Sequence, residues 1–268
     1  MTDAIPVPAV SRPGFVRRAG AGAWHVPAGF GFLLRHPRLW PLAALPTFFA
    51  VLLMLAGAIL AIYMVPKVES YVAPTPGQLP VWVELPVSLL LWTATVGAGI
   101  FLGLGLALLL SAPLLDLLSR RVEAQARGVV DDAGPGLRFE IVQSLRGAVY
   151  FLVAAPGVFL LGFVPVIGPL LSLLWGARAV AFQMTDPALS RRGMSFAAKR
   201  RWHHEWLFES EGFGLAGMVG LLAPFANLAL GSALVAGGTL LVLDLERLSG
   251  TGKAAGSSAV ATPPASRE

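Results

Sequence analysis

The sequence contains no cysteine and few charged residues. The absence of cysteine excludes disulfide frameworks, thiolate zinc sites and cysteine nucleophiles, although it leaves the redox compartment open. Charged residues make up 13% of the chain and hydrophobic residues 56%, against about 25% and roughly 45–50% in soluble domains. A chain with so few charges cannot coat a soluble globule. The composition therefore predicts a membrane protein.

Asp, Glu, Lys and Arg are absent from four long stretches, which are residues 39–66, 85–115, 147–177 and 212–243. Each stretch exceeds the ~20 apolar residues that cross a hydrocarbon core about 30 Å thick. The same absence argues against a buried carboxylate relay of the kind that proton pumps use. The stretches also lack the polar pairs of membrane proteases and phosphatases. We therefore expect no enzymatic activity, no cofactor and no metal site.

A signal peptide is also absent, because residues 1–38 carry prolines and scattered arginines without an apolar core before a small-residue site. We expect the first apolar stretch to stay in the protein. Residues 1–24 are predicted to form a disordered basic tail, residues 25–247 a membrane domain, and residues 248–268 a second disordered tail. The short apolar segment 27–34, which precedes Arg35, is typical of an amphipathic helix at the membrane surface.

The net charge of +5 and the pI of about 10.2 raise the question of nucleic-acid binding. The 20 Lys and Arg residues, however, lie almost wholly in the segments that flank the apolar stretches. Membrane proteins place basic residues there because of the positive-inside bias. We therefore expect the lipid bilayer as the partner, and no nucleic acid.

The first two apolar stretches are predicted to be full transmembrane helices. Pro41 and Pro46 lie near the start of the first, where a helix tolerates proline. In the second, small residues recur every four positions and form a stripe that lets another helix approach closely. The stripe consists of Thr95, Gly99, Gly103, Ala107 and Ser111. It predicts a packing seam within a bundle or a homo-oligomer, and the alternative is that Gly and Ala are simply common in this chain.

The third and fourth apolar stretches are each interrupted by a turn signal, which lies at Pro165 and Gly168 in one and at Pro224 and Asn227 in the other. Each stretch is therefore predicted to be a hairpin of two shorter helices. A turn at membrane depth must be packed in protein or line a wet cavity, so these four residues are candidates for lining a pore. Asn227 has the alternative role of capping the second helix of its hairpin.

The distribution of basic residues predicts how the hairpins are threaded. The five hydrophilic segments contain 5, 1, 5, 6 and 3 Lys or Arg residues in chain order. If each hairpin returns to the side it entered, 19 of them face the cytoplasm together with both termini, and Lys67 alone faces out. The fold class is therefore an all-α integral membrane protein with two long transmembrane helices and two Pro/Gly-broken hairpins. Whether the hairpins cross fully or stop halfway stays open.

Few residues offer chemistry. Arg35 and Arg38, beside the first span, could bind an anion with their guanidinium forks, or they could anchor a helix at the headgroups. Residues 212–217 satisfy GxGxxG, but no strand precedes them, and close helix packing is the preferred explanation. His203 and His204 are adjacent on a predicted helix, so their imidazoles point about 100° apart and chelate poorly. Asp116 and Glu123 lie in a predicted solvated extension of the second span, where pairing with neighbours is more plausible than catalysis.

Taken in order, the motifs of residues 25–247 resemble the EI24 domain and CysZ-type sulfate permease family. The resemblance rests on His36-Pro37-Arg38-Leu39-Trp40, Pro46, Ala112-Pro113-Leu114-Leu115-Asp116, Arg121-Val122-Glu123, Val164-Pro165-Val166-Ile167-Gly168, Asp186-Pro187, Phe213-Gly214, Pro224 with Asn227, and Gly237-Gly238-Thr239 before Asp244. Each motif alone has low specificity, but their order and spacing together are more specific.

The resemblance implies two long transmembrane helices, two partly inserted hairpins, a homo-oligomer and, in the bacterial branch, inward movement of sulfate across the cytoplasmic membrane. It therefore predicts a transporter or channel that passes a small anion, with sulfate as the candidate. The alternative is a membrane scaffold of the same fold that transports nothing. Sulfate-type members carry a Gly-Leu-Arg-Arg-like sequence after the proline that matches Pro37. Here the aligned residues 38–41 read Arg-Leu-Trp-Pro, so the glycine and the paired arginines are absent.

Overall fold

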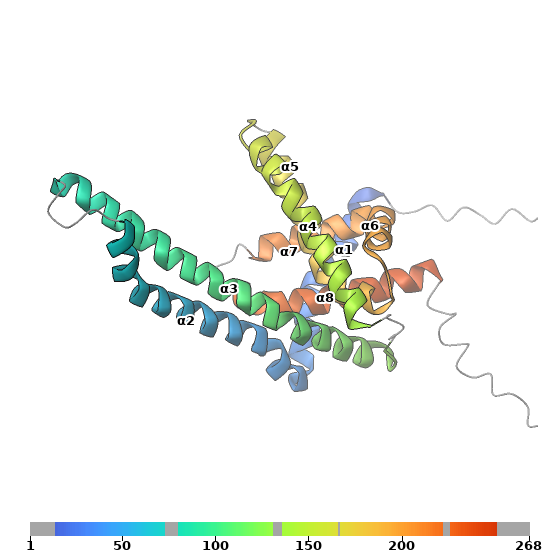
Figure 1. Ribbon diagram of the computed structural model, residues 1–268. Helices are drawn as coiled ribbons and strands as arrows, with labels where there is room; N and C mark the ends of the chain where they lie inside the picture. The colour runs from blue at the N-terminus through green and yellow to red at the C-terminus, as the bar shows by residue number, and fades with distance from the viewer. Residues whose placement is uncertain (1–13, 73–79, 131–135, 166, 222–225, 251–268) are drawn as a thin grey trace, which may run out of the picture.

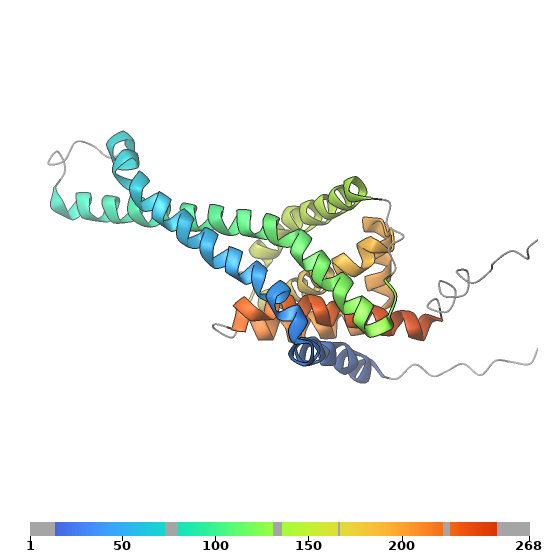
Figure 2. The ribbon, with the colours of Figure 1, turned by 90° about the horizontal axis from the view of Figure 1, so that it is seen from below.

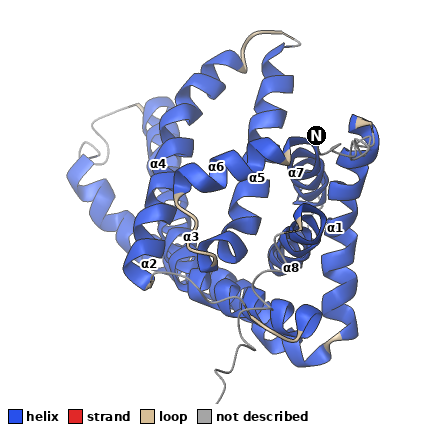
Figure 3. Ribbon diagram, turned by 90° about the vertical axis from the view of Figure 1, so that its right-hand side faces the viewer, coloured by secondary structure: helices blue, strands red, loops and turns tan. Residues whose placement is uncertain are grey.

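The computed structural model describes residues 14–72, 80–130, 136–165, 167–221 and 226–250, and every regular element in these ranges is a helix (Figure 3). The predicted all-α class is thereby confirmed for the described residues. The elements are α1 (Phe15–Arg35), η1 (Pro37–Leu39), α2 (Trp40–Val72), α3 (Val81–Arg127), α4 (Leu137–Leu161), α5 (Ile167–Arg191), α6 (Phe196–Glu205), α7 (Leu207–Leu221) and α8 (Ala226–Ser249).

Helices α2 and α3 form a long hairpin that extends away from the other helices (Figure 1 and Figure 2). Both contain the predicted full spans, and both are long and apolar enough to cross a membrane. The two helices cross so closely that a Cβ atom on Gly99 would overlap the carbonyl oxygen of Gly57, and a Cβ atom on Gly103 would overlap that of Leu53. Among the described helices, α5 is a third that is long and apolar enough to span.

The other helices pack into a body in which α7 contacts both α1 and α5. A Cβ atom on Gly212 would overlap the carbonyl oxygen of Ala19 in α1, and one on Gly214 would overlap that of Ala177 in α5. The GxGxxG segment is therefore a helix-packing surface, as predicted from its position. Its glycines are needed because the three backbones lie too close for side chains.

Both predicted breaks occur where the turn signals lie. Helix α4 ends at Leu161 and α5 begins at Ile167, while α7 ends at Leu221 and α8 begins at Ala226. Helices α4 and α5 run side by side and project together from the body (Figure 1). The depth to which either hairpin enters a bilayer stays a prediction.

The predicted disorder of residues 1–24 is wrong for residues 15–24, because α1 begins at Phe15. Residues 1–13 lie outside the described part of the chain. The sequence signal was misleading because the small residues of this segment make contacts that apolar periodicity does not reveal. Arg18 also ties the segment down by donating to both carboxylate oxygens of Glu209, at 2.6 and 2.9 Å. The predicted surface helix 27–34 is thus the second half of a longer helix that packs on α7 and α8.

At the other end, α8 continues to Ser249, so the first residues of the predicted C-terminal tail are also helical. Residues 251–268 lie outside the described part of the chain.

Candidate functional site

A buried guanidinium lies at the end of α5, where that helix meets α3. Arg191 is 0% exposed, and it donates hydrogen bonds to Asp116 Oδ1 at 2.9 Å, Ser119 Oγ at 2.9 Å and Glu123 Oε2 at 2.8 Å. Glu123 is also 0% exposed. A buried charge is tolerated only when it is paired and hydrogen-bonded, and these contacts supply both conditions. Arg191 Nε is nevertheless without a hydrogen-bond partner among the described atoms.

Further ion pairs extend this arrangement to α8. Arg192 donates to the second carboxylate oxygen of Glu123 at 2.9 Å and forms another ion pair with Glu246. Arg127 reaches the same Glu246 at 2.8 Å. The ion-paired residues and Ser119 together are called the polar network below. It consists of Asp116, Ser119, Glu123, Arg127, Arg191, Arg192 and Glu246. The network holds α3, α5 and α8 together.

The spacing of three network residues on α3 explains why they all contact Arg191. Asp116, Ser119 and Glu123 are three and four positions apart, which places them on one face of a helix. The predicted pairing of Asp116 and Glu123 is confirmed. The predicted solvation is wrong for Glu123, because the polar face of the helical extension is covered by α5 and α8 rather than by water.

Helix α6 adds a second buried polar cluster beside α5. Lys199 is buried, and its Nζ donates to Asp186 Oδ1 at 2.5 Å and to Ser190 Oγ at 2.6 Å. His203 is hydrogen-bonded to Thr185 Oγ1 at 3.2 Å and stacks on Phe182. Burial, followed by the positive charges of Arg178 and Lys199, lowers the pKa of His203 from 6.5 to about 3. His203 is therefore neutral at physiological pH.

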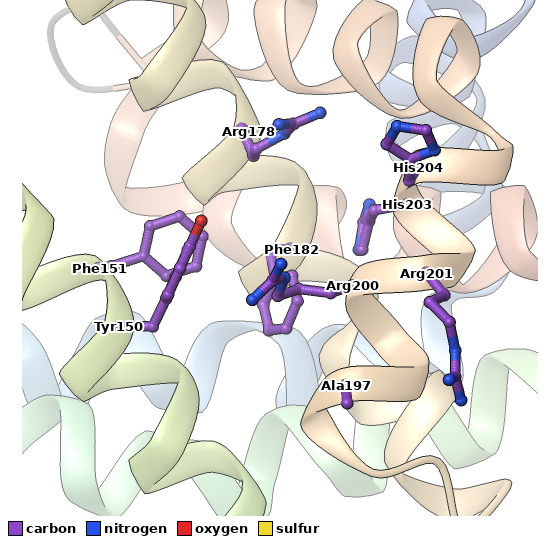
Figure 4. A pocket seen from close by; sticks show the side chains of 9 residues that line it. All are labelled: Tyr150, Phe151, Arg178, Phe182, Ala197, Arg200, Arg201, His203 and His204. Carbon is purple, nitrogen blue, oxygen red and sulfur yellow. The ribbon is translucent and has the colours of Figure 1, made fainter.

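A pocket of about 500 Å³ opens between α4, α5 and α6 (Figure 4). Arginines and aromatic rings dominate its lining, which consists of Tyr150, Phe151, Arg178, Phe182, Ala197, Arg200, Arg201, His203 and His204. Arg178 pairs with Glu211 at 2.8 Å, and the Arg200 guanidinium lies 5.3 Å from the centre of the Tyr150 ring. This basic pocket was not foreseen from the sequence, because its cations come from segments that the charge pattern marked only as cytoplasmic flanks.

The predicted anion-binding pair lies in neither polar region. Arg35 ends α1 and Arg38 lies in η1, and both are exposed. The junction between them is fixed by Leu33 and Leu39, which pack in one core cluster with Leu118 of α3. The two arginines are thus placed close to the part of α3 that carries the polar network.

The predicted turn residues have different surroundings. Pro165 is exposed in the turn between α4 and α5. Gly168 is buried, and a Cβ atom there would overlap the carbonyl oxygen of Leu161, so only glycine allows this close approach at the turn. The backbone of Asn227 belongs to the first turn of α8, and Pro224 lies outside the described residues.

The small-residue stripe of α3 is largely covered by the chain itself. Gly99 and Gly103 face α2, Ala107 and Ser111 are buried, and Thr95 is half-buried. The imidazoles of His203 and His204 diverge, since the first is buried and the second exposed. Within the described ranges, no group of three or more His, Asp or Glu side chains could hold a metal ion.

Comparison with known proteins shows to which family this chain is similar. The model of the family described as "Sulfate transporter CysZ/Etoposide-induced protein 2.4" matches residues 26–230. Three similar proteins, each named "Sulfate transporter CysZ", come from Pseudomonas fluorescens. That of strain Pf-5 is 32% identical over 146 residues, which are 50% of this chain and 58% of the relative. That of strain SBW25 is 30% identical over 147 residues, which are 50% of this chain and 57% of the relative.

That of strain Pf0-1 is 27% identical over 252 residues, which are 88% of this chain and 94% of the relative. The chain therefore spans little more than half the length of the first two relatives, whereas its match to the third covers nearly the whole of both proteins.

Proposed function

Because the chain belongs to the EI24 family of CysZ-type integral membrane proteins, we propose that it transports a small oxyanion, with sulfate as the candidate, inward across the cytoplasmic membrane. The family match over residues 26–230 is the observation that carries this proposal. The activity is transport and not catalysis. Both termini face the cytoplasm, and the functional unit is a homo-oligomer.

The buried guanidinium of Arg191 supports the choice of an anion. A dehydrated oxyanion needs hydrogen-bond donors that replace its lost water, and guanidinium groups supply them in a fixed geometry. Arg191 lies beyond the charge-free stretch of α5, in the segment that the proposed topology places in the cytoplasm, so it would meet the anion at the cytoplasmic end of the path. Arg191 lies among Asp116, Ser119 and Glu123, and its Nε has no partner among the described atoms. We place the path of the anion beside this group.

The exposed arginines at the junction of α1 and α2 support an exit point on the cytoplasmic side, where the proposed topology places residues 1–38. Arg35 and Arg38 are accessible to solvent, and their junction packs against Leu118, one position before Ser119 of the network. Clusters of positive charge raise the local concentration of anions. In this proposal the two arginines bind the anion at the cytoplasmic end of its path, where it is released, and the turn residues Pro165, Gly168, Pro224 and Asn227 line the remaining path.

Uptake of radiolabelled sulfate into proteoliposomes tests the proposal. The purified chain should accumulate sulfate above empty vesicles, and unlabelled chloride should not compete. The double variant R35Q/R38Q should take up sulfate several-fold more slowly, because it loses the positive charges at the cytoplasmic end of the path without burying a new group. The double variant R17Q/R247Q is the matched control, since it removes two other exposed arginines. If sulfate, sulfite and thiosulfate all fail to enter above the level of empty vesicles, transport is refuted and a scaffold role is favoured.

A further inference from the structure

The basic pocket lies at a boundary along α4 and α5. From Gly147 to Ala177 neither helix carries a charged residue, and Arg178 is the first charge after the turn. Between the pocket and the turn, large apolar side chains face outward, such as Leu152 at 72% and Val153 at 73% exposure. Leu170 and Leu174 of α5 are exposed as well. Such a surface suits hydrocarbon and not water.

The aromatic residues mark the same boundary. Tyr150 and Trp175 are in contact, with ring centres 5.7 Å apart, at the level where the charges of α5 begin. Tyr and Trp are enriched at the headgroup level of a bilayer, because their rings are amphipathic. Helix α6 then places further cations beside this level. The pocket is therefore positioned where the headgroups of one membrane leaflet lie.

The charge of the pocket favours an anionic headgroup. Its lining contains three arginines, and only Arg178 forms an ion pair within the described part of the chain. Arg200 stacks on Tyr150, which leaves its N–H groups able to donate. The Arg178 and Arg200 side chains reach into the pocket from different helices (Figure 4). Guanidinium forks from two helices that line one pocket suit one phosphodiester.

The size of the pocket favours a lipid headgroup over a free inorganic ion as its ligand. A volume of about 500 Å³ lies within the range of sites for small organic ligands, roughly 300–1,000 Å³. An inorganic oxyanion would fill only a small part of it. A headgroup with its glycerol fills more of it, while the attached acyl chains can lie on the apolar surfaces next to it.

We propose that the basic pocket binds the headgroup of an anionic phospholipid, with the phosphodiester between Arg178 and Arg200 and the acyl chains directed along α4 and α5 toward their turn. The bound lipid completes the surface between α6 and the α4–α5 hairpin and anchors that hairpin at a fixed depth. The proposal does not depend on which ion the protein transports, or on whether it transports one.

Lipid retention by the purified full-length chain in detergent tests this site. Phosphatidylglycerol and phosphatidylcholine with the same acyl chains are added separately, and native mass spectrometry counts the molecules that remain bound. The variant R200Q/R201Q should bind phosphatidylglycerol about 30-fold more weakly, about fivefold for each arginine lost. Both residues are exposed, so the variant should fold. R200K/R201K, which keeps the charge, should retain most of the binding, and R17Q/R247Q should bind as the wild type does.

Three results would overturn the proposal. The first is equal retention of phosphatidylcholine and phosphatidylglycerol. The second is unchanged retention of phosphatidylglycerol by R200Q/R201Q. The third is displacement of phosphatidylglycerol by inorganic sulfate at equal concentration, because the pocket would then be a site for a free oxyanion.

Discussion

Arg191 of α5 and Glu123 of α3 form an ion pair of 2.8 Å in which both side chains are 0% exposed. The pair does not stand alone, because Arg192 occupies the other oxygen of the same carboxylate. Glu123 thus bridges two consecutive arginines, each of which has a second carboxylate partner, Asp116 for Arg191 and Glu246 for Arg192. This arrangement links the end of one apolar helix to the end of another and makes Glu123 the central residue of the polar network.

Removal of the Glu123 charge should destabilise the protein strongly. In the variant E123Q the two guanidinium groups lose their shared carboxylate and keep only Asp116 and Glu246, so the network carries one excess positive charge. Removing one partner of a buried ion pair costs about 3–5 kcal/mol. We expect the midpoint of thermal unfolding in detergent to fall by roughly 6 °C or more. E205Q is the matched control, because Glu205 is exposed and its loss should change stability by less than about 0.5 kcal/mol. An unchanged midpoint for E123Q would mean that the pair does not hold the helices together.

The network could be predicted from the sequence only in part. The spacing of Asp116, Ser119 and Glu123 indicates one polar face on α3. If another helix covers that face, its carboxylates need a cation as their partner. Which arginine supplies the partner could not be predicted, because Arg191 is 68 positions away from Glu123 and lies in a run of cations that is also explained by the positive-inside bias. The choice between water and protein depends on tertiary packing that a single sequence does not encode locally.

The helix-packing stripe gives a test with a control in the same turn. In G99A the new methyl group would overlap the Gly57 carbonyl oxygen, so α2 and α3 must separate. The expected cost is about 1–3 kcal/mol, seen as a lower unfolding temperature and a lower yield of monodisperse protein. G97A should lower neither, because a Cβ atom there meets nothing within 4 Å, and the higher helix propensity of Ala should raise the stability by up to about 1 kcal/mol. Equal behaviour of the two variants would show that the close crossing of α2 and α3 is absent in the membrane.

Long elements of the fold were predictable, and short-range contacts between them were not. The first two charge-free stretches correspond to α2 and α3, and the two turn signals correspond to the breaks before α5 and α8. The first half of α1 was missed because Ala19 and Gly22 give no apolar periodicity and stabilise the helix only by letting α7 approach. Residues of this kind favour disorder in a local analysis, although they are the ones that close helix packing requires.

Acid should destabilise the protein through His203. The unfolded chain takes up a proton at this residue near pH 6.5, whereas the folded chain does so only at about pH 3. The stabilisation by neutral His203 is therefore complete above pH 6.5 and is lost as the pH falls toward 3. Between pH 6.5 and about pH 5 the loss amounts to about 2 kcal/mol. The drop in unfolding temperature over this interval should be smaller in H203Q than in the wild type.

H204Q provides the comparison for this effect, since His204 is exposed and points away from His203. It should keep the acid sensitivity of the wild type. If H203Q and the wild type lose the same stability on acidification, other groups dominate the response and the buried His203 does not.

Single cysteines can test the threading of the chain, because the natural sequence has none. The proposed topology places Gln78 outside and Asp132, Glu205 and Ser257 in the cytoplasm, in accordance with 19 basic residues on one side and one on the other. Glu205 is the informative position, because it lies between the two hairpins and is exposed at the end of α6. Ser190, in the same segment, is buried and would not react on either side.

In intact cells, an impermeant maleimide should label only the cysteine of Q78C, and permeabilisation should expose the other three. The reason is energetic, because transfer of the α5–α6 region to the outside would carry six basic residues across the membrane against the positive-inside bias. External labelling of E205C would show that the α4–α5 hairpin crosses the membrane only once. In that case α5, which is long and apolar enough to span, would have to be part of a third transmembrane segment.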